Sequence, residues 1–189
     1  MAQPNPAEPG PEDQSADVEA AVDDVARTIS SVGPRRHARI IAFKVLYEAD
    51  VAHHAPQDVL ERILEAEAPA PRVRSYARDL VDGVLARRPE LDATIMRLAP
   101  AWPLRQMAAV ERTLLRLGLF ECLHMQDRVP LRAAMNEAIE LAKLYGSDST
   151  PRFINGVLGN VSPAPASTGG EGPETLEQTT QSQELSHNL

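Results

Sequence analysis

Hydrophobic residues in the central part of the chain recur every three or four positions, the spacing of one helix face, and no segment shows the alternation typical of strands. Proline and glycine residues divide this pattern into separate segments. The pattern predicts an all-α fold of about seven helices. The expected helices span residues 35–53, 56–66, 73–88, 89–98, 104–125, 130–145 and 151–161.

The segment 104–125 is apolar almost all round, as is typical of the central helix of a bundle. Its Cys122 is expected to be a small core residue, and a single cysteine excludes an internal disulfide. Gly83, Gly118 and Gly156 fall inside expected helices, where each costs about 1 kcal/mol relative to alanine. We interpret these glycines as places where two helices approach closely.

The turn between the last two expected helices carries its own signals. Gly146 follows Tyr145, as a glycine often follows the last helical turn. Asp148, Ser149 and Thr150 offer side-chain oxygens that can cap the next helix. From the sequence alone, Asp148 is interpreted as a cap.

The formal charge of −8 is unevenly distributed along the chain. Residues 1–33 hold seven acidic side chains and one basic one, giving −6, and residues 162–189 hold four acidic side chains, giving −4. Because −8 minus −10 is +2, the central residues form a mildly basic body. The low apolar content of both ends predicts disordered acidic tails. We therefore expect a tail over 1–33, a helical domain over 34–162 and a second tail over 163–189.

The sequence contains no motif of an enzyme or a metal centre: no glycine-rich phosphate loop, no zinc-ligand spacing and no nucleophile motif. His53 and His54 are adjacent, so they point to different helix faces and make a poor metal pair. Glu137 and Glu140 share one helix face, which we interpret as solvated or paired with Lys143. We expect a non-enzymatic protein that uses no cofactor or metal.

The sequence does not indicate secretion or membrane insertion. The N-terminus lacks a basic start followed by an apolar run. No stretch of about 18 apolar residues is found. We therefore expect a cytoplasmic protein.

Four basic residues gather at the start of the first expected helix: Arg35, Arg36, His37 and Arg39. A helix N-terminus carries partial positive charge, so each cation there is unfavourable by about a few tenths of a kcal/mol. A bound phosphate reverses this effect, because free N–H groups and guanidinium groups all donate to it. No partner for the cluster in the body of the domain is obvious from the sequence. The cluster indicates an anionic ligand, with a solvated basic flank as the equally weighted alternative.

Two aromatic residues, Phe43 and Tyr47, lie four positions apart on the same expected helix, away from its main apolar stripe. Such a pair can stack on nucleic-acid bases, contact a protein partner or pack against a neighbouring helix. For Phe43 we favour packing against a neighbouring helix.

Several segments together resemble the NusB family of bacterial transcription antitermination factors. The resemblance covers about residues 34–162. Its most specific parts are Asn136–Lys143 and Phe153–Leu158, whereas the arginine cluster alone is not specific. The other matching segments are residues 35–39 with Ala42, Leu46 and Tyr47, residues 76–80 and residues 110–112.

The resemblance implies an all-helical domain of two packed sub-bundles that binds boxA, a short single-stranded RNA in ribosomal RNA leader transcripts. It also implies a protein partner, NusE, which is a small-subunit ribosomal protein. The pair is expected to join RNA polymerase and other Nus factors, so that transcription of ribosomal RNA genes resists termination.

The resemblance also implies roles for individual residues. His37 stands where family members often have arginine, so the electrostatic contribution of this position is expected to be weaker. Asp148 matches a position where substitution affects function. Tyr47 and Glu111 match positions that face NusE. The expected RNA-binding residues are Arg35, Arg36, His37, Arg39, Lys44, Arg152 and Phe153.

Two alternatives stay open at the level of sequence. The first is a protein-interaction module or homodimer with no direct role in RNA binding. The second is a domain of the kind that precedes some ribosomal RNA cytosine methyltransferases. The second alternative requires a following cofactor-binding domain, and residues 163–189 supply only a polar segment.

Overall fold

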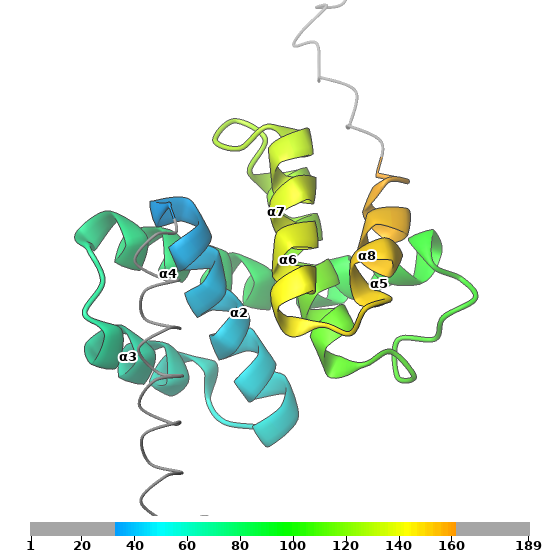
Figure 1. Ribbon diagram of the computed structural model, residues 1–189. Helices are drawn as coiled ribbons and strands as arrows, with labels where there is room; N and C mark the ends of the chain where they lie inside the picture. Colours follow the sequence, from blue (N-terminus) through cyan, green and yellow to red (C-terminus); the bar gives the residue numbers. More distant parts are fainter. Residues whose placement is uncertain (1–32, 162–189) are drawn as a thin grey trace, which may run out of the picture.

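The computed structural model describes residues 33–161, so the predictions about the two acidic tails lie outside the described residues. Within that range the chain forms seven α-helices and no strand (Figure 1). The predicted all-α fold is confirmed. The helices are α2 (Pro34–Ala52), α3 (Pro56–Glu67), α4 (Pro71–Ala86), α5 (Arg88–Leu98), α6 (Ala109–His124), α7 (Leu131–Tyr145) and α8 (Thr150–Leu158).

The helices pack as two sub-bundles, as predicted. The first consists of α2, α3 and α4, and in the second α6 packs against α5, α7 and α8. Helix α6 also contacts α2 and α4, so it joins the two halves (Figure 1). Four leucines of α6 that point in different directions are all buried, which confirms its central position. They are Leu114, Leu115, Leu117 and Leu119.

The central helix begins five residues later than the sequence indicates, at Ala109 rather than at position 104. The preceding residues form turns instead, in which the Gln106 N–H donates to the Pro103 carbonyl at 2.8 Å. The Arg112 guanidinium donates to the carbonyls of Leu104 and Met107, each at 3.2 Å. This side chain satisfies carbonyls outside the helix and stabilises the turn.

Two of the three helical glycines lie at close helix contacts, as predicted. A Cβ added at Gly83 would collide with the ring of Phe120, and one at Gly118 would lie 3.0 Å from Leu158 and 3.1 Å from Ala138. At Gly156 nothing lies within 4 Å of an added Cβ, so the prediction was wrong for this residue.

Gly146 ends α7 as predicted, but not through the left-handed conformation that often favours glycine there. Its φ is −96° and its ψ is 180°, which any residue can adopt. A Cβ at this position would lie 2.5 Å from the Thr150 Cβ and 2.7 Å from the Ala142 carbonyl oxygen. Glycine is required here because the chain turns back closely on itself.

An ionic network around the buried carboxylate of Asp50 links α2 to the second sub-bundle. The Asp50 carboxylate accepts hydrogen bonds from Arg112 at 2.5 and 3.0 Å, from Arg116 at 3.2 Å and from Arg88 at 2.8 Å. Burial by itself would raise the pKa of Asp50, but the hydrogen bonds from Arg112 and the three positive charges outweigh it and lower that pKa. The network fixes how the two halves sit relative to one another.

Candidate nucleic-acid interface

The predicted basic cluster lies in the first two turns of α2. The helix starts at Pro34, has no side-chain cap at Gly33 and carries no acidic residue in its first turn. The sequence alone suggested no partner for the cluster in the body of the domain. That expectation was wrong, because carboxylates from three other helices reach it.

Arg36 is paired but remains accessible. Its Nε and Nη2 donate to the two carboxylate oxygens of Glu137 in α7, at 2.9 and 2.8 Å. The side chain of Arg36 keeps 40% of its surface exposed. The hydrogen bonds from Arg36 hold the pKa of Glu137 below its ordinary value, against the effect of burial. This arginine is thus oriented by the protein and still open to an external anion.

Arg39 lies inside the protein, with 3% of its surface exposed. Its Nε donates to both carboxylate oxygens of Glu121 at 2.8 and 3.0 Å. The hydroxyl of Tyr76 donates to the same carboxylate at 2.5 Å. Burial, together with the charge of Glu121 and this hydrogen bond, raises the pKa of Tyr76. In this geometry Arg39 joins α2 to α6 and does not reach solvent.

His37 and Lys44 share one carboxylate at the end of α3. His37 Nε2 and Lys44 Nζ each lie 2.9 Å from an oxygen of Glu67. Burial by itself would raise the pKa of Glu67, but the hydrogen bonds from His37 and Lys44 outweigh it and lower that pKa. Both side chains therefore turn toward α3 rather than toward Arg35.

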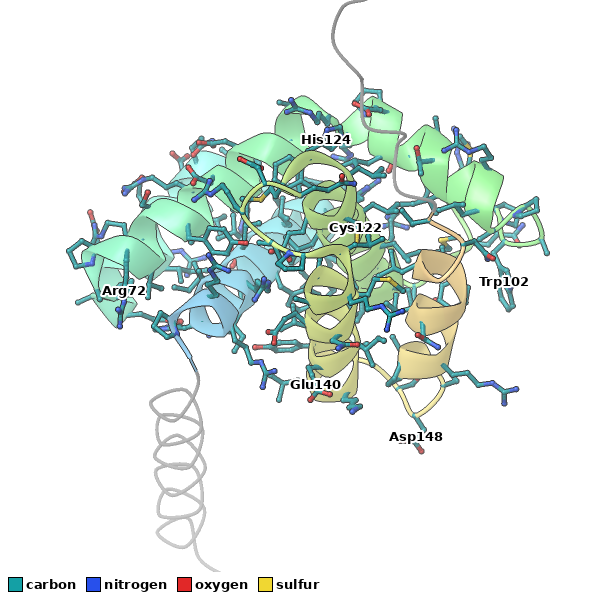
Figure 2. The ribbon with its side chains drawn as sticks, turned by 90° about the horizontal axis from the view of Figure 1, so that it is seen from above. Arg72, Trp102, Cys122, His124, Glu140 and Asp148 are labelled. Atoms are coloured by element: carbon teal, nitrogen blue, oxygen red, sulfur yellow. The ribbon has the colours of Figure 1, made fainter. Side chains whose placement is uncertain are left out.

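An exposed basic surface remains at this end of the first sub-bundle. Arg35 is exposed at the start of α2, and Arg72 is exposed at the start of α4, which Figure 2 shows at the edge of the molecule. Arg128 places its guanidinium 5.4 Å from the centre of the Tyr76 ring and bonds Asp79 at 2.8 Å. We call Arg35, Arg36, Arg72 and Arg128 the arginine surface.

The two remaining predicted RNA contacts lie in the other sub-bundle. Arg152 is exposed on α8, and Phe153 is half-buried beside it. Arg35, Arg36 and His37 thus lie at the start of α2, with His37 turned toward α3, whereas Arg152 and Phe153 lie on α8 in the other sub-bundle.

Asp148 lies exposed in the turn between α7 and α8 and points away from the protein (Figure 2). Its interpretation as a cap was wrong, because Ser149 occupies the N-cap position and no side chain caps α8. The turn is held instead by Thr150, whose Oγ1 accepts from the Ser147 N–H at 3.1 Å. Asp148 thus makes no local contact that explains its presence.

The predicted partner-facing residue Tyr47 lines an apolar groove of about 660 Å³. Phe43 is buried, as predicted, and stacks on Tyr145 with ring centres 4.5 Å apart and on Tyr47 at 5.8 Å. Lys44 lines the same groove. We call this feature the tyrosine groove; its apolar walls are Phe43, Tyr47, Val51, Ile63, Val110 and Tyr145.

Glu111 is half-buried and follows Val110, which lines the tyrosine groove, but Glu111 itself does not line it. Its Oε1 lies 3.5 Å from the Thr150 hydroxyl, which is buried at the start of α8. Of the two predicted partner-facing residues, Tyr47 lines the groove, whereas the carboxylate of Glu111 is directed toward the start of α8.

Sequence reasoning overlooked Trp102, which lies in the turns before α6 and is 56% exposed. Its ring meets Phe153 edge-on, with ring centres 5.7 Å apart. The available signal was the one tryptophan of the chain, placed between Pro100 and Pro103 in a segment assigned partly to a helix.

The described residues contain no group of three or more histidine, cysteine or acidic side chains that could hold a metal ion. Cys122 is buried in α6, as predicted, and burial raises the pKa of its thiol to about 12. Within residues 33–161, every helix is too short or too polar to cross a lipid bilayer.

Comparisons with known proteins agree on one family. The sequence pattern of the NusB family matches residues 36–163. The transcription antitermination protein NusB of Roseiflexus sp. (strain RS-1) is 45% identical over 128 residues, which cover 67% of this chain and 90% of that protein. That name describes a transcription factor rather than an enzyme.

Solved structures give the same result. The NusB of T. maritima superposes with a TM-score of 0.63 at 31% identity, covering 67% of this chain and 89% of that one. A chain in a crystal structure of the antitermination factors NusB and NusE in complex with dsRNA gives 0.61 at 29% identity, covering 67% and 93%. This chain therefore belongs to the NusB family of transcription antitermination proteins.

Proposed function

We propose that this protein binds boxA RNA of ribosomal RNA operons together with NusE and supports transcription of ribosomal RNA genes. The observation that carries the proposal is that a single helix, α2, bears two different surfaces. Its first turns supply Arg35 and Arg36 to the arginine surface, and its later turns supply Tyr47 and Val51 to the tyrosine groove. A protein that must hold RNA and a partner at once needs two such surfaces side by side.

The arginine surface is suited to RNA phosphates. Arg36 is oriented by Glu137 yet 40% exposed, and Arg35 has no carboxylate partner within the described residues. Guanidinium groups donate two parallel hydrogen bonds to a phosphate. We assign the first contacts with RNA to Arg35 and Arg36, and we assign Arg39 to holding the fold.

The tyrosine groove is suited to a protein partner. Its walls are mostly aromatic and aliphatic, and Val51 is 51% exposed in it. Aromatic side chains are enriched at protein interfaces. The solved complex of NusB and NusE with dsRNA supports NusE as a partner, and we assign NusE to this groove. In this proposal Tyr47 and Glu111 contact NusE.

The proposal places the protein in the cytoplasm, in an RNA polymerase complex with other Nus factors. It needs no cofactor and no chemical step, because binding two partners at once is sufficient for the role. We take residues 34–162 as the RNA-binding domain.

Titration of labelled boxA RNA and a scrambled RNA, each with and without NusE, tests the proposal. We expect tighter binding of boxA than of the scrambled RNA, with a further gain when NusE is present. The logarithm of the affinity should fall with the logarithm of the salt concentration, with a slope of about −0.7 for each phosphate neutralised.

Variants with matched controls sharpen this test. The double substitution Arg35→Ala/Arg36→Ala should weaken boxA binding at least about tenfold, because it removes two charge-assisted contacts. Arg78→Ala is the control, since Arg78 is a partly exposed arginine paired with Glu61 that belongs neither to the arginine surface nor to the tyrosine groove. Equal affinity for boxA and scrambled RNA, with or without NusE, would contradict the proposal. A stable dimer by light scattering that does not bind RNA would favour a protein-interaction module.

A further inference from the structure

A second hollow lies between the turns that precede α6 and the outer face of α8. It measures about 490 Å³, and its walls are largely apolar. Figure 2 shows Trp102 projecting from the edge of the molecule beside α8. We call this feature the tryptophan hollow; it is lined principally by Leu98, Trp102, Arg152, Phe153, Gly156 and Val157.

The indole of Trp102 is presented to solvent by local backbone structure. The backbone N–H of Trp102 donates to the Ala99 carbonyl at 2.9 Å, which fixes the turn that carries the side chain. The Trp102 ring meets Phe153 at an interplanar angle of 65°, so the two rings are not stacked face to face. An indole that is 56% exposed and held in place is a ready surface for stacking.

The charge around the hollow has a single sign. No carboxylate lines it, and Arg152 is its one charged lining residue. Arg97 and Arg105 lie on the chain segments on either side of Trp102, and both are exposed. In the described part of the chain none of these three arginines has a carboxylate partner. Asp148, which precedes α8, points away from the protein (Figure 2).

Gly156 leaves the floor of the hollow open. Nothing lies within 4 Å of the place where its Cβ would be, so the glycine does not serve a helix contact inside the chain. A flat ring can therefore approach the α8 backbone closely at this point.

We propose that the tryptophan hollow binds one unpaired nucleobase of the RNA, with the base stacked on Trp102 and an adjacent phosphate held by Arg152. Aromatic platforms flanked by cations are the common solution for binding unpaired nucleotides, because every base has a face that can stack. The inference rests on the proposed function, since it extends the RNA from the arginine surface to the second sub-bundle.

The single tryptophan makes the contact directly measurable. Titration of the full chain with single-stranded boxA RNA should quench the tryptophan fluorescence in parallel with binding measured by anisotropy of the labelled RNA. Trp102→Ala should weaken binding about 5- to 140-fold, which corresponds to the loss of one base stacked on an aromatic ring. Trp102→Phe should retain most of the affinity.

Met96→Ala is the matched control, because Met96 is 51% exposed on the neighbouring helix α5 and does not line the hollow. Circular dichroism of each variant checks that the fold is intact. Normal RNA binding by folded Trp102→Ala, or RNA binding without quenching, would overturn the inference. Quenching by NusE in the absence of RNA would also overturn it, since the hollow would then be a protein contact.

The outcomes separate this inference from the proposed function. RNA binding that depends on Arg35 and Arg36 but not on Trp102 would support the proposed function and contradict the inference that the tryptophan hollow binds a base. Absence of specific RNA binding by the unsubstituted protein, with and without NusE, would contradict both the proposed function and the inference about the hollow.

Discussion

The guanidinium of Arg39 and the carboxylate of Glu121 form an ion pair inside the protein, with 3% and 1% of the two residues exposed. The pair links α2 to α6 across the boundary between the two sub-bundles. An arginine that belongs by sequence to the predicted RNA-binding cluster thus holds the fold together.

Arg39→Met should therefore destabilise the protein more than it weakens any RNA contact. Removing one partner of a buried pair leaves the other charge uncompensated, which costs about 3–5 kcal/mol. Urea denaturation measures this loss in the free energy of unfolding. Arg36→Met is the control, and it should cost less than about 1 kcal/mol because its pair with Glu137 is partly exposed.

The double variant Arg39→Met/Glu121→Leu completes this test. Replacing both partners of a buried pair by apolar groups of similar size is often close to neutral. It should therefore recover part of the stability that Arg39→Met loses, less the contribution of the Tyr76 hydroxyl, which loses its acceptor when Glu121 is replaced. A stability of Arg39→Met equal to that of the unsubstituted protein would refute the structural role.

The sequence predicted which residues are helical because the apolar periodicity is strong, and the start of α2 differed by one residue from expectation. The start of α6 was misplaced because apolar residues before Ala109 continue the pattern, although they lie in turns. Hydrogen bonds from Arg112 to the Leu104 and Met107 carbonyls hold these residues in turns. Periodicity carries no information about such contacts.

The candidate site was less predictable than the fold. The basic residues at positions 35–39 are close together in sequence, but the carboxylates that pair with them come from positions 67, 121 and 137. These pairings decide which of the basic side chains are buried and which stay exposed. Pairings across such separations depend on how helices pack. The role proposed for Trp102 was hidden for the same reason, because Phe153 contacts it and Gly156 lines the same hollow only in the folded chain.

The pair between Arg36 and Glu137 should contribute to stability only above acidic pH. The hydrogen bonds from Arg36 lower the pKa of Glu137 in the folded state. Because glutamate in the unfolded chain has a pKa of about 4.3, the folded state binds fewer protons than the unfolded chain around that pH. The contribution is present above that pH and is lost as the pH falls through the folded pKa. Thermal unfolding between neutral pH and about pH 3 should show Glu137→Gln converging with the unsubstituted protein at the acidic end.

Glu140→Gln is the matched control for this pH dependence. Glu140 lies one turn further along α7 and pairs with Lys143 on the exposed surface. Its substitution should change stability by only a few tenths of a kcal/mol. A constant difference between Glu137→Gln and the unsubstituted protein across the whole pH range would contradict the prediction.

Two glycines inside helices should respond oppositely to alanine. Gly83→Ala places a Cβ against the Phe120 ring in the core, so we expect a loss of about 1–3 kcal/mol. Gly156→Ala meets open space in α8, so the higher helix propensity of alanine should stabilise the protein by about 0.5–1 kcal/mol. Chemical denaturation of both variants checks the sign of each change in the free energy of unfolding. Stabilisation by both substitutions would show that helix propensity outweighs packing at position 83.

The acidic residues of the N-terminal tail should weaken RNA binding when the salt concentration is low. Residues 1–33 carry a charge of −6 and are joined directly to the first turn of α2, where Arg35 and Arg36 lie. Carboxylates linked by the chain to these arginines would compete with phosphates for the same cations. Salt would screen this competition, because the Debye length shortens from about 10 Å at 0.1 M to about 3 Å at 1 M. Replacing the seven acidic residues of this tail by Asn or Gln in the full chain should therefore increase boxA affinity several-fold at 50 mM salt, with the gain disappearing near 1 M.

The same replacement of the four acidic residues in 162–189 controls for net charge, because that tail leaves the domain after α8 rather than next to the arginine surface. If the effect arises from local competition, the C-terminal replacement should change boxA affinity less than the N-terminal one, per charge removed. Equal gains per charge would mean that only the overall charge of the protein matters. No gain from either replacement would show that the tails do not compete for the cations of α2.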